Sequence, residues 1–291
     1  MRPLQQKSPW LVERIDAARP MTVFAFHHAG GSASQFHSWQ FRLEPLARVS
    51  AIQLPGRGGR FREAFATSLE ATAADIASVI GERQSGPFAL FGHSMGALLA
   101  FEVSRHLAKF GFPQACHLFV AGAAAPKDIA NTERLADLPD DDLLQVLQSM
   151  NGLPADLSIQ DRDLIRAMLP TLRADFRLEE NYEYVPGELL NVPITVLAGR
   201  VDPVVPSSSM RAWARETLCT TQTHVIEGDH FFVDSNQAAV LTVLRTVLGL
   251  DAERKPPAPL SDLHGSSCDC QPLVVRNSLG SSSETIQCLK N

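Results

Sequence analysis

The segment from Pro87 to Gly96, which reads PFALFGHSMG, constrains the fold of this chain more than any other. An apolar run of strand-like composition leads directly into the pattern G-x-S-x-G, and the apolar residues from Ala97 onward are typical of a buried helix. A strand, a sharp turn and a helix in this order predict a nucleophile elbow, in which the serine projects above the edge of a sheet. Ser94 is therefore a candidate nucleophile, and the alternative is a structural glycine-rich turn.

A serine hydroxyl needs a base and an orienting carboxylate before it becomes a good nucleophile. The strand-like run 193–198 is followed by Asp202, and the run 223–226 is followed by His230. Each candidate thus follows the carboxyl end of a predicted strand, and the chain order Ser, Asp, His is that of α/β hydrolases. The sequence predicts a catalytic triad of Ser94, Asp202 and His230.

Other polar residues compete for these roles. Asp229 is a rival for the acid, but adjacent side chains in a loop seldom face one another, so we interpret it as a turn former beside His230. Packing or surface roles are expected for the remaining candidate histidines, which are His27, His28, His93 and His224. No pair of them has metal-ligand spacing beside a carboxylate, so the sequence predicts neither zinc nor another cofactor.

A tetrahedral intermediate also needs two backbone N–H donors. The amide of Met95, directly after the nucleophile, is expected to be one of them. The second is expected from the loop that follows the strand-like run 21–26 and continues HHAGGSA. Within that loop, Ala29 and Gly30 are both candidates.

Apolar strand-like runs alternate with helix-like stretches along the chain. Strands are predicted near 11–15, 21–27, 49–54, 87–92, 117–122, 193–199 and 222–227, and helices near 68–83, 96–110, 207–217 and 235–249. The alternation predicts an α/β fold, a mostly parallel sheet covered by helices. Because the gap before Pro193 is too long for an ordinary crossover, residues 126–190 are expected to form an inserted helical lid. Two short amphipathic helices are expected there, the second interrupted at Pro170, either lining an acyl pocket or serving as core contacts.

The 291 residues suit one catalytic domain, residues 1–251, followed by a polar, serine-rich tail, residues 252–291, that is expected to be disordered. No apolar run approaches the roughly 20 residues of a membrane span, and the start lacks the apolar stretch of a secretion signal. Five cysteines without framework spacing fit reduced thiols, and a net charge of -6 argues against nucleic-acid binding. A cytoplasmic monomer is the expectation.

Five short motifs together resemble the type II thioesterases of polyketide and nonribosomal peptide assembly lines. They are HHAGGSA at 27–33, QLPGRGGR at 53–60, FGHSMG at 91–96, RADF at 173–176 and GDHFF at 228–232. The resemblance extends over about residues 10–250 and also includes the related fatty-acid synthase thioesterase that works as a separate chain. Two departures are His27, where the family usually has proline, and the tail, for which we recognise no counterpart.

The resemblance implies hydrolysis of stalled or wrongly loaded acyl groups from the phosphopantetheine thiol of an acyl or peptidyl carrier protein. It implies Ser94 as nucleophile, Asp202 as orienter and His230 as base, with the amides of Ala29 and Met95 as the oxyanion hole. Three alternatives stay open, namely a general carboxylesterase or lipase-like hydrolase, a medium-chain fatty acyl carrier protein thioesterase, and a scaffold that only binds carrier proteins.

Carrier proteins are typically acidic, so a locally basic docking surface is expected. Arg57, Arg60 and Arg62 form the obvious cluster in the sequence. The interpretation that we favour for this cluster is a solvated loop that only shapes the rim of the site, and carrier-protein docking is the alternative.

Overall fold

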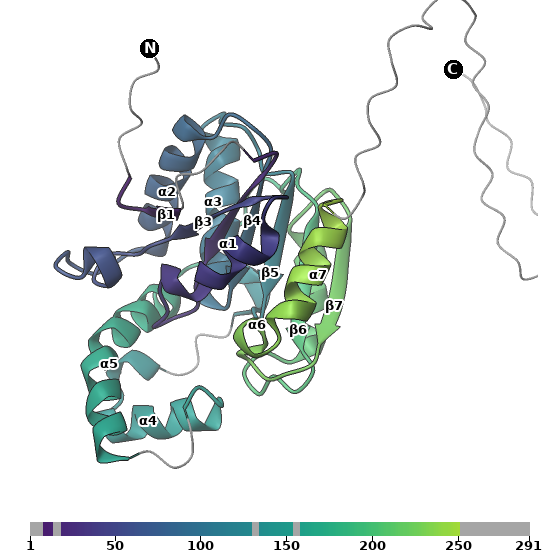
Figure 1. The fold of residues 1–291 in the computed structure, drawn as a ribbon. Helices are drawn as coiled ribbons and strands as arrows, with labels where there is room; N and C mark the ends of the chain where they lie inside the picture. The colour runs from purple at the N-terminus through teal and green to yellow at the C-terminus, as the bar shows by residue number, and fades with distance from the viewer. Residues whose placement is uncertain (1–7, 14–18, 130–133, 154–157, 251–291) are drawn as a thin grey trace, which may run out of the picture. The chain divides into compact units, whose positions relative to one another are not determined.

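The computed structural model describes residues 8–13, 19–129, 134–153 and 158–250. Its centre is a seven-stranded sheet of order β1-β3-β2-β4-β5-β6-β7 (Figure 1). The strands are β1 (Leu11–Glu13), β2 (Thr22–Phe26), β3 (Arg48–Ile52), β4 (Phe88–His93), β5 (His117–Ala121), β6 (Ile194–Gly199) and β7 (Thr221–Ile226). Only the β1–β3 pair is antiparallel among these strands, which confirms the predicted mostly parallel sheet. The predicted tail, 252–291, lies outside the described residues.

Helices cover both faces of this sheet (Figure 1). The α-helices are α1 (His37–Leu43), α2 (Leu69–Arg83), α3 (Met95–Lys109), α4 (Asp140–Ser149), α5 (Ile159–Glu180), α6 (Phe232–Ser235) and α7 (Gln237–Val247). Short 3-10 helices are η1 (Ala33–Phe36), η2 (Gly58–Arg60), η3 (Pro126–Asp128), η4 (Leu135–Asp137) and η5 (Ser207–Arg215). Helices α2 and α3 contribute to one apolar cluster, and α1 and α7 to the other.

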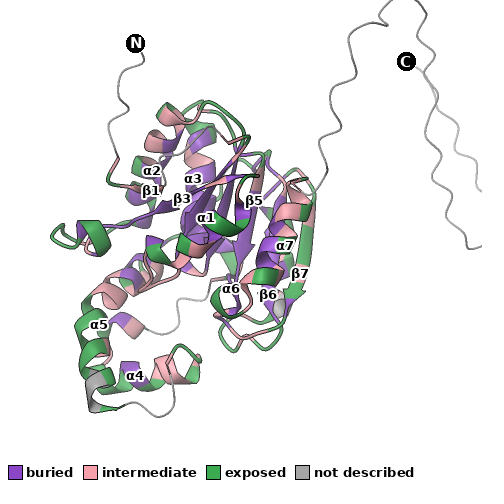
Figure 2. Cartoon of the chain, in the orientation of Figure 1, coloured by how far each residue is buried: buried purple, intermediate pink, exposed green. Residues whose placement is uncertain are grey.

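The central strands are apolar on both sides because both faces are buried. In β4, Phe88 and Leu90 belong to the cluster with α2 and α3, while Ala89 and Phe91 belong to the cluster with α1 and α7. Successive side chains of a strand point to opposite faces, so covering both faces demands an uninterrupted apolar run. Figure 2 shows the central strands as the most buried part of the chain.

Three predicted helices differ from the structure. The helix expected near 207–217 is the 3-10 helix η5, which begins after Pro206 with three serines, a residue type that competes with helical hydrogen bonding. The helix expected near 235–249 is divided at Asn236 into α6 and α7. The predicted interruption at Pro170 is wrong, because the 22-residue helix α5 runs through this position without a break. Pro170 is exposed, so the carbonyl that loses its partner lies on the solvent side.

Helices α4 and α5 lie between β5 and β6 in the sequence and stand at the carboxyl edge of the sheet (Figure 1). They meet through a small apolar cluster that includes Leu143, Leu144 and Leu169. A capping box between Ser158 and Asp161 starts α5. Among the described helices, none combines the length and the apolar character that crossing a membrane requires.

Candidate active site

Ser94 occupies the turn between β4 and α3 with φ 55° and ψ -123°, a backbone conformation that residues other than glycine rarely adopt. A Cβ at Gly92 would lie 2.2 Å from the Gly96 carbonyl oxygen, and a Cβ at Gly96 would lie 2.4 Å from the Phe26 carbonyl oxygen. Glycine is therefore required at both positions for α3 to pack so closely against β4 and the end of β2. This strand-turn-helix geometry is the predicted elbow.

The three predicted triad residues lie in one continuous chain of hydrogen bonds. His230 Nε2 lies 3.0 Å from Ser94 Oγ, and His230 Nδ1 lies 2.9 Å from Asp202 Oδ2. The other Asp202 oxygen accepts the backbone N–H groups of Val204 and Val205 at 2.8 and 3.0 Å. The carboxylate is fully buried and is held from two sides, so it fixes the orientation of the imidazole.

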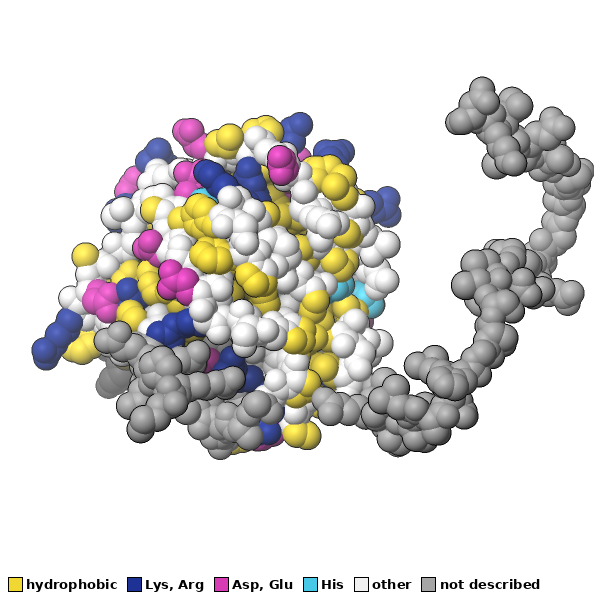
Figure 3. All heavy atoms as spheres, turned by 90° about the horizontal axis from the view of Figure 1, so that it is seen from above, with side chains coloured by type: hydrophobic (Ala, Val, Ile, Leu, Met, Phe, Trp, Pro, Cys, Tyr) yellow, Lys and Arg dark blue, Asp and Glu magenta, His cyan; other side chains and the backbone are white. Residues whose placement is uncertain are grey.

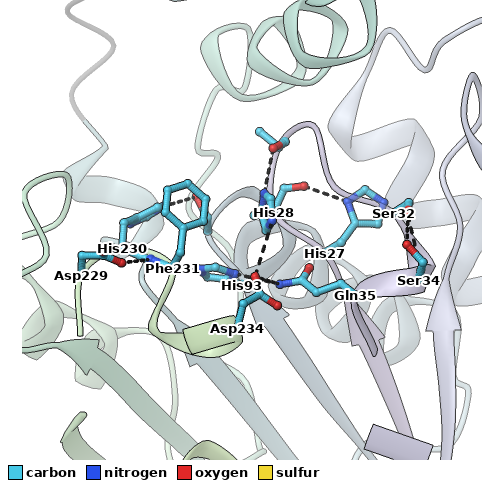
Figure 4. A network of polar contacts seen from close by, with 12 residues as sticks. His27, His28, Ser32, Ser34, Gln35, His93, Asp229, His230, Phe231 and Asp234 are labelled. Atoms are coloured by element: carbon cyan, nitrogen blue, oxygen red, sulfur yellow. Dashed lines mark hydrogen bonds and ion pairs between the residues drawn. The ribbon is translucent and has the colours of Figure 1, made fainter. Parts of the chain in front are cut away.

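The Asp229 carboxylate is oriented elsewhere. Its Oδ1 accepts the backbone N–H of Phe231 at 2.8 Å, which is the turn-forming role expected from the sequence (Figure 4). The ring of His93 reaches the same loop, because its Nε2 donates to the backbone carbonyl of His230 at 2.8 Å. Burial lowers the pKa of His93 well below its ordinary value, so this ring is neutral and its hydrogen bond supports the backbone of His230.

The loop after β2 is held by its own histidines. The His28 carbonyl accepts His27 Nδ1 at 2.8 Å and the Gly31 N–H at 3.0 Å. In a trans peptide the N–H points away from the carbonyl, so the Ala29 N–H faces the opposite direction from these donors. His27 is buried, and burial lowers its pKa to about 3. The packing role expected for His27 thus includes ordering this loop.

The structure narrows the choice of backbone N–H donors for the oxyanion hole. The N–H of Gly30 donates to Asp175 Oδ2 at 2.8 Å, so it is already engaged. Of the two candidates in the loop, the geometry favours Ala29. Met95 is the first residue of α3, where backbone N–H groups have no acceptor within the helix.

A cavity of about 550 Å³ opens beside Ser94 and His230. Its apolar lining comes from α3, from the segment between β5 and β6 and from the loops after β2, β6 and β7, and it includes Leu98, Leu147, Met150, Leu172 and Phe176. Glu179 also lines the cavity, and burial raises the pKa of its carboxyl group. The cavity suits an acyl chain with its carbonyl at Ser94.

A second polar cluster lies beside His230 (Figure 4). One potential ligand atom from each of His28, His93 and Asp234 lies within 4.8 Å of the others. Sequence spacing could not reveal this grouping, because the residues come from three separate segments. The amide nitrogen of Gln35 bridges two of them, donating to Asp234 at 3.0 Å and lying 3.4 Å from His93 Nδ1. Because the Gln35 amide already binds Asp234 and His93, we assign no metal to these three residues.

The predicted basic docking cluster is wrong for two of its three arginines. Arg57 and Arg60 are buried, the first paired with Asp175 and the second with Glu63, and only Arg62 is exposed. The favoured interpretation, a solvated rim loop, is wrong for Arg57 and Arg60 for the same reason. On the face seen in Figure 3, basic and acidic side chains are interspersed around a band of hydrophobic ones.

Comparison with known proteins agrees with this geometry. The family model of the thioesterase domain matches residues 21–248. Linear gramicidin dehydrogenase LgrE of Brevibacillus parabrevis is 36% identical over 83% of this chain and 93% of its own length. Gramicidin S biosynthesis protein GrsT of Aneurinibacillus migulanus is 35% identical over 79% of this chain and 90% of its own length.

Among solved structures, the type II thioesterase BorB from the borrelidin biosynthetic cluster is 32% identical. It superposes with a TM-score of 0.76 over 84% of this chain and 100% of its own length. The chain therefore belongs to the thioesterase family and is a type II thioesterase of the kind found in nonribosomal peptide and polyketide biosynthesis.

Proposed function

We propose that this chain hydrolyses acyl thioesters carried on the phosphopantetheine arm of carrier proteins, with Ser94 as nucleophile, His230 as base and Asp202 as orienter. Type II thioesterases act on carrier-protein-bound intermediates in these pathways. The observation that carries the proposal is the hydrogen-bond chain from Asp202 through His230 to Ser94, at the mouth of an apolar cavity.

In the first half of the reaction, Ser94 Oγ attacks the thioester carbonyl carbon while its proton passes to His230 Nε2. Asp202 stabilises the imidazolium that forms. The negative charge on the carbonyl oxygen is held by the N–H groups of Ala29 and Met95, which are fixed before the reaction starts.

The attack of Ser94 gives a tetrahedral intermediate. When this intermediate collapses, the carbon–sulfur bond breaks, and His230 gives its proton to the departing pantetheine sulfur. The acyl group is then esterified to Ser94. A water molecule gives a proton to His230 and attacks the ester, and the second collapse returns the proton to Ser94 Oγ and releases the carboxylic acid. The step needs no oxidant or reductant.

We also propose that residues 126–190 act as a lid over the acyl chain. Support comes from Leu147, Met150, Leu172 and Phe176, which this segment places in the cavity wall. The name of one relative suggests redox chemistry, but hydride transfer has no use for a serine at an elbow hydrogen-bonded to a histidine. The elbow favours acyl transfer.

The test is intact-protein mass spectrometry of an acyl-phosphopantetheinyl carrier protein incubated with the wild type or with Ser94→Ala, beside the matching small ester. We expect the acyl mass to disappear only with the wild type, and faster than the ester is hydrolysed. Cleavage of the ester with a fully loaded carrier would indicate a general esterase. Retained hydrolysis by Ser94→Ala would refute the nucleophile.

A further inference from the structure

A buried ion pair joins helix α5 to the loop after β3, and both partners also bind the loop that carries Ala29. The side chain of Asp175, on α5, is 0% exposed and that of Arg57 is 7% exposed. Arg57 Nη2 donates to Asp175 Oδ1 at 2.6 Å, and Nη1 donates to Oδ2, so the pairing is bidentate. The same Oδ2 accepts the backbone N–H of Gly30 at 2.8 Å.

The two glycines after Ala29 are therefore enclosed on several sides. Arg57 Nη1 also lies 3.3 Å from the Gly31 carbonyl oxygen, which it donates to. Gly30 has a φ of +76°, and a Cβ there would lie 2.9 Å from Leu172 Cδ1, again on α5. The contacts of α5 and Arg57 thus fix the peptides directly after Ala29, just as His27 fixes the peptide before it.

Stability alone does not explain this arrangement. A buried ion pair gains little over apolar residues of similar size, because both charges must be removed from water. It does restrict geometry, since a carboxylate that accepts two guanidinium bonds and one backbone N–H has one position. The contact also joins three segments that are far apart in the sequence, namely the β2–η1 loop, the β3–η2 loop and α5.

Building on the proposed function, we propose that Asp175 is a positioning residue for the oxyanion hole. Through the Gly30 N–H and Arg57 it holds the loop so that the Ala29 N–H is aimed at the developing oxyanion. The same helix thus lines the acyl cavity and holds the loop of the oxyanion hole. Asp175 itself does not contact the reacting atoms.

The decisive variant is Asp175→Asn, which keeps the shape of the side chain and removes its charge. We expect kcat on an acyl carrier protein to fall about 10²-fold, the effect of losing one oxyanion donor, with KM changed less than about threefold. Reaction of Ser94 with a fluorophosphonate should slow by a similar factor, because the phosphoryl oxygen occupies the same hole. The milder Arg57→Lys, which keeps a cation but loses the fork, should lower kcat about tenfold.

Asp140→Asn is the matched control. Asp140 pairs with Arg173 of α5 at 2.7 Å but lies 55% exposed and belongs to α4, so its loss should leave kcat within about threefold. Rates are expressed per active site, titrated with the fluorophosphonate, and folding is checked by thermal melting.

Three outcomes would overturn the proposal. They are an unchanged kcat in folded Asp175→Asn, a loss confined to KM, and an equal loss in Asp140→Asn. If Asp175→Asn does not fold, Arg57→Lys decides by the same criteria. If wild type releases no acyl group from carrier proteins yet reacts with the fluorophosphonate, the proposed function fails. The phosphonylation rates of the variants still test Asp175 independently.

Discussion

The sheet core and the segment between β5 and β6 both line one cavity, and they do so in different ways. In the core, strands such as β4 are buried throughout, and both faces pack against helices. In the other segment the apolar contacts are fewer, and Leu164 and Met168 of α5 are 66% and 53% exposed (Figure 2). The chemistry is thus placed on the half with more buried surface, and the acyl chain is enclosed by the half with less.

This difference teaches where each kind of change is tolerated. Backbone packing around the elbow leaves no room for a single added carbon at Gly92. Side chains of α4 and α5 that face the cavity are only partly buried, so they can change with small effects on the fold. Asp175 differs from these cavity-facing side chains, because it is buried against the loop after β2.

The largest expected effect concerns the orienting acid in the core. Asp202→Asn should lower kcat about 10³- to 10⁴-fold, because an amide cannot hold His230 in the tautomer that accepts a proton from Ser94. Asp229→Asn is the matched control, since an amide oxygen can still accept the Phe231 N–H. Steady-state kinetics of both variants decide between the two acids, and comparable losses would contradict the assignment.

A glycine in each half tests the difference in packing. Gly92→Ala would place a methyl group 2.2 Å from a backbone oxygen, and we expect a loss of more than about 4 kcal/mol or no folded protein. At Gly152 an added Cβ would lie 3.1 Å from Phe231 Cζ and 3.2 Å from the Leu147 carbonyl oxygen, so Gly152→Ala should cost only about 1 to 2 kcal/mol. Chemical denaturation measures both, and equal losses would remove the contrast.

Acid should weaken the core in particular. Burial lowers the pKa of His27 from 6.5 to about 3, and it lowers the pKa of His93 well below 6.5. As the pH falls, His27 and His93 are therefore protonated in the unfolded chain at a higher pH than in the folded one. Their contribution to the free energy of unfolding is fully present above pH 6.5 and is lost as the pH falls toward their pKa values in the folded state. In this range the free energy of unfolding falls by about 1.4 kcal/mol per pH unit for each histidine.

Residues 126–190 contain no histidine, so this effect belongs to the core alone. Denaturant unfolding between about pH 7.5 and 5 gives the slope, and His93→Asn should reduce it by about one histidine's share. A free energy of unfolding that stays constant across this range would contradict the prediction.

The core could be predicted because its signals are local. The run from Phe88 to Gly96 encodes a strand, a turn and a helix in adjacent residues, and the glycines report the close packing directly. The positions of Asp202 and His230 follow from the rule that functional groups gather at the carboxyl ends of parallel strands. The structure joins Asp202 to Ser94 through His230, and their catalytic roles stay predictions for kinetics to test.

The rest depends on contacts between distant segments, which leave no local pattern. Arg57 and Asp175 are separated by more than a hundred residues, so the sequence alone predicts only a surface charge for an arginine in a glycine-rich loop. His93 sits at the variable position of the elbow motif, and only the fold shows its bond to the His230 carbonyl. Pro170 carries a strong local signal for a helix end, but its exposed position allows α5 to continue.

The smallest effect sharpens the comparison from the other half. Met150, at the end of α4, lines the cavity and is half-buried, so Met150→Ala should lengthen the space for the acyl chain. We expect the ratio of kcat/KM for long over short acyl carrier proteins to change about fivefold, with a Tm shift of about 2 °C or less. Val146→Ala is the control, because Val146 lies on the same helix but not in the cavity lining, and its ratio should stay within about twofold. A changed Tm with unchanged selectivity would mean that α4 supports the fold and does not set the acyl preference. The assignment of the chemistry to the sheet core and of acyl selectivity to the segment between β5 and β6 would then be wrong.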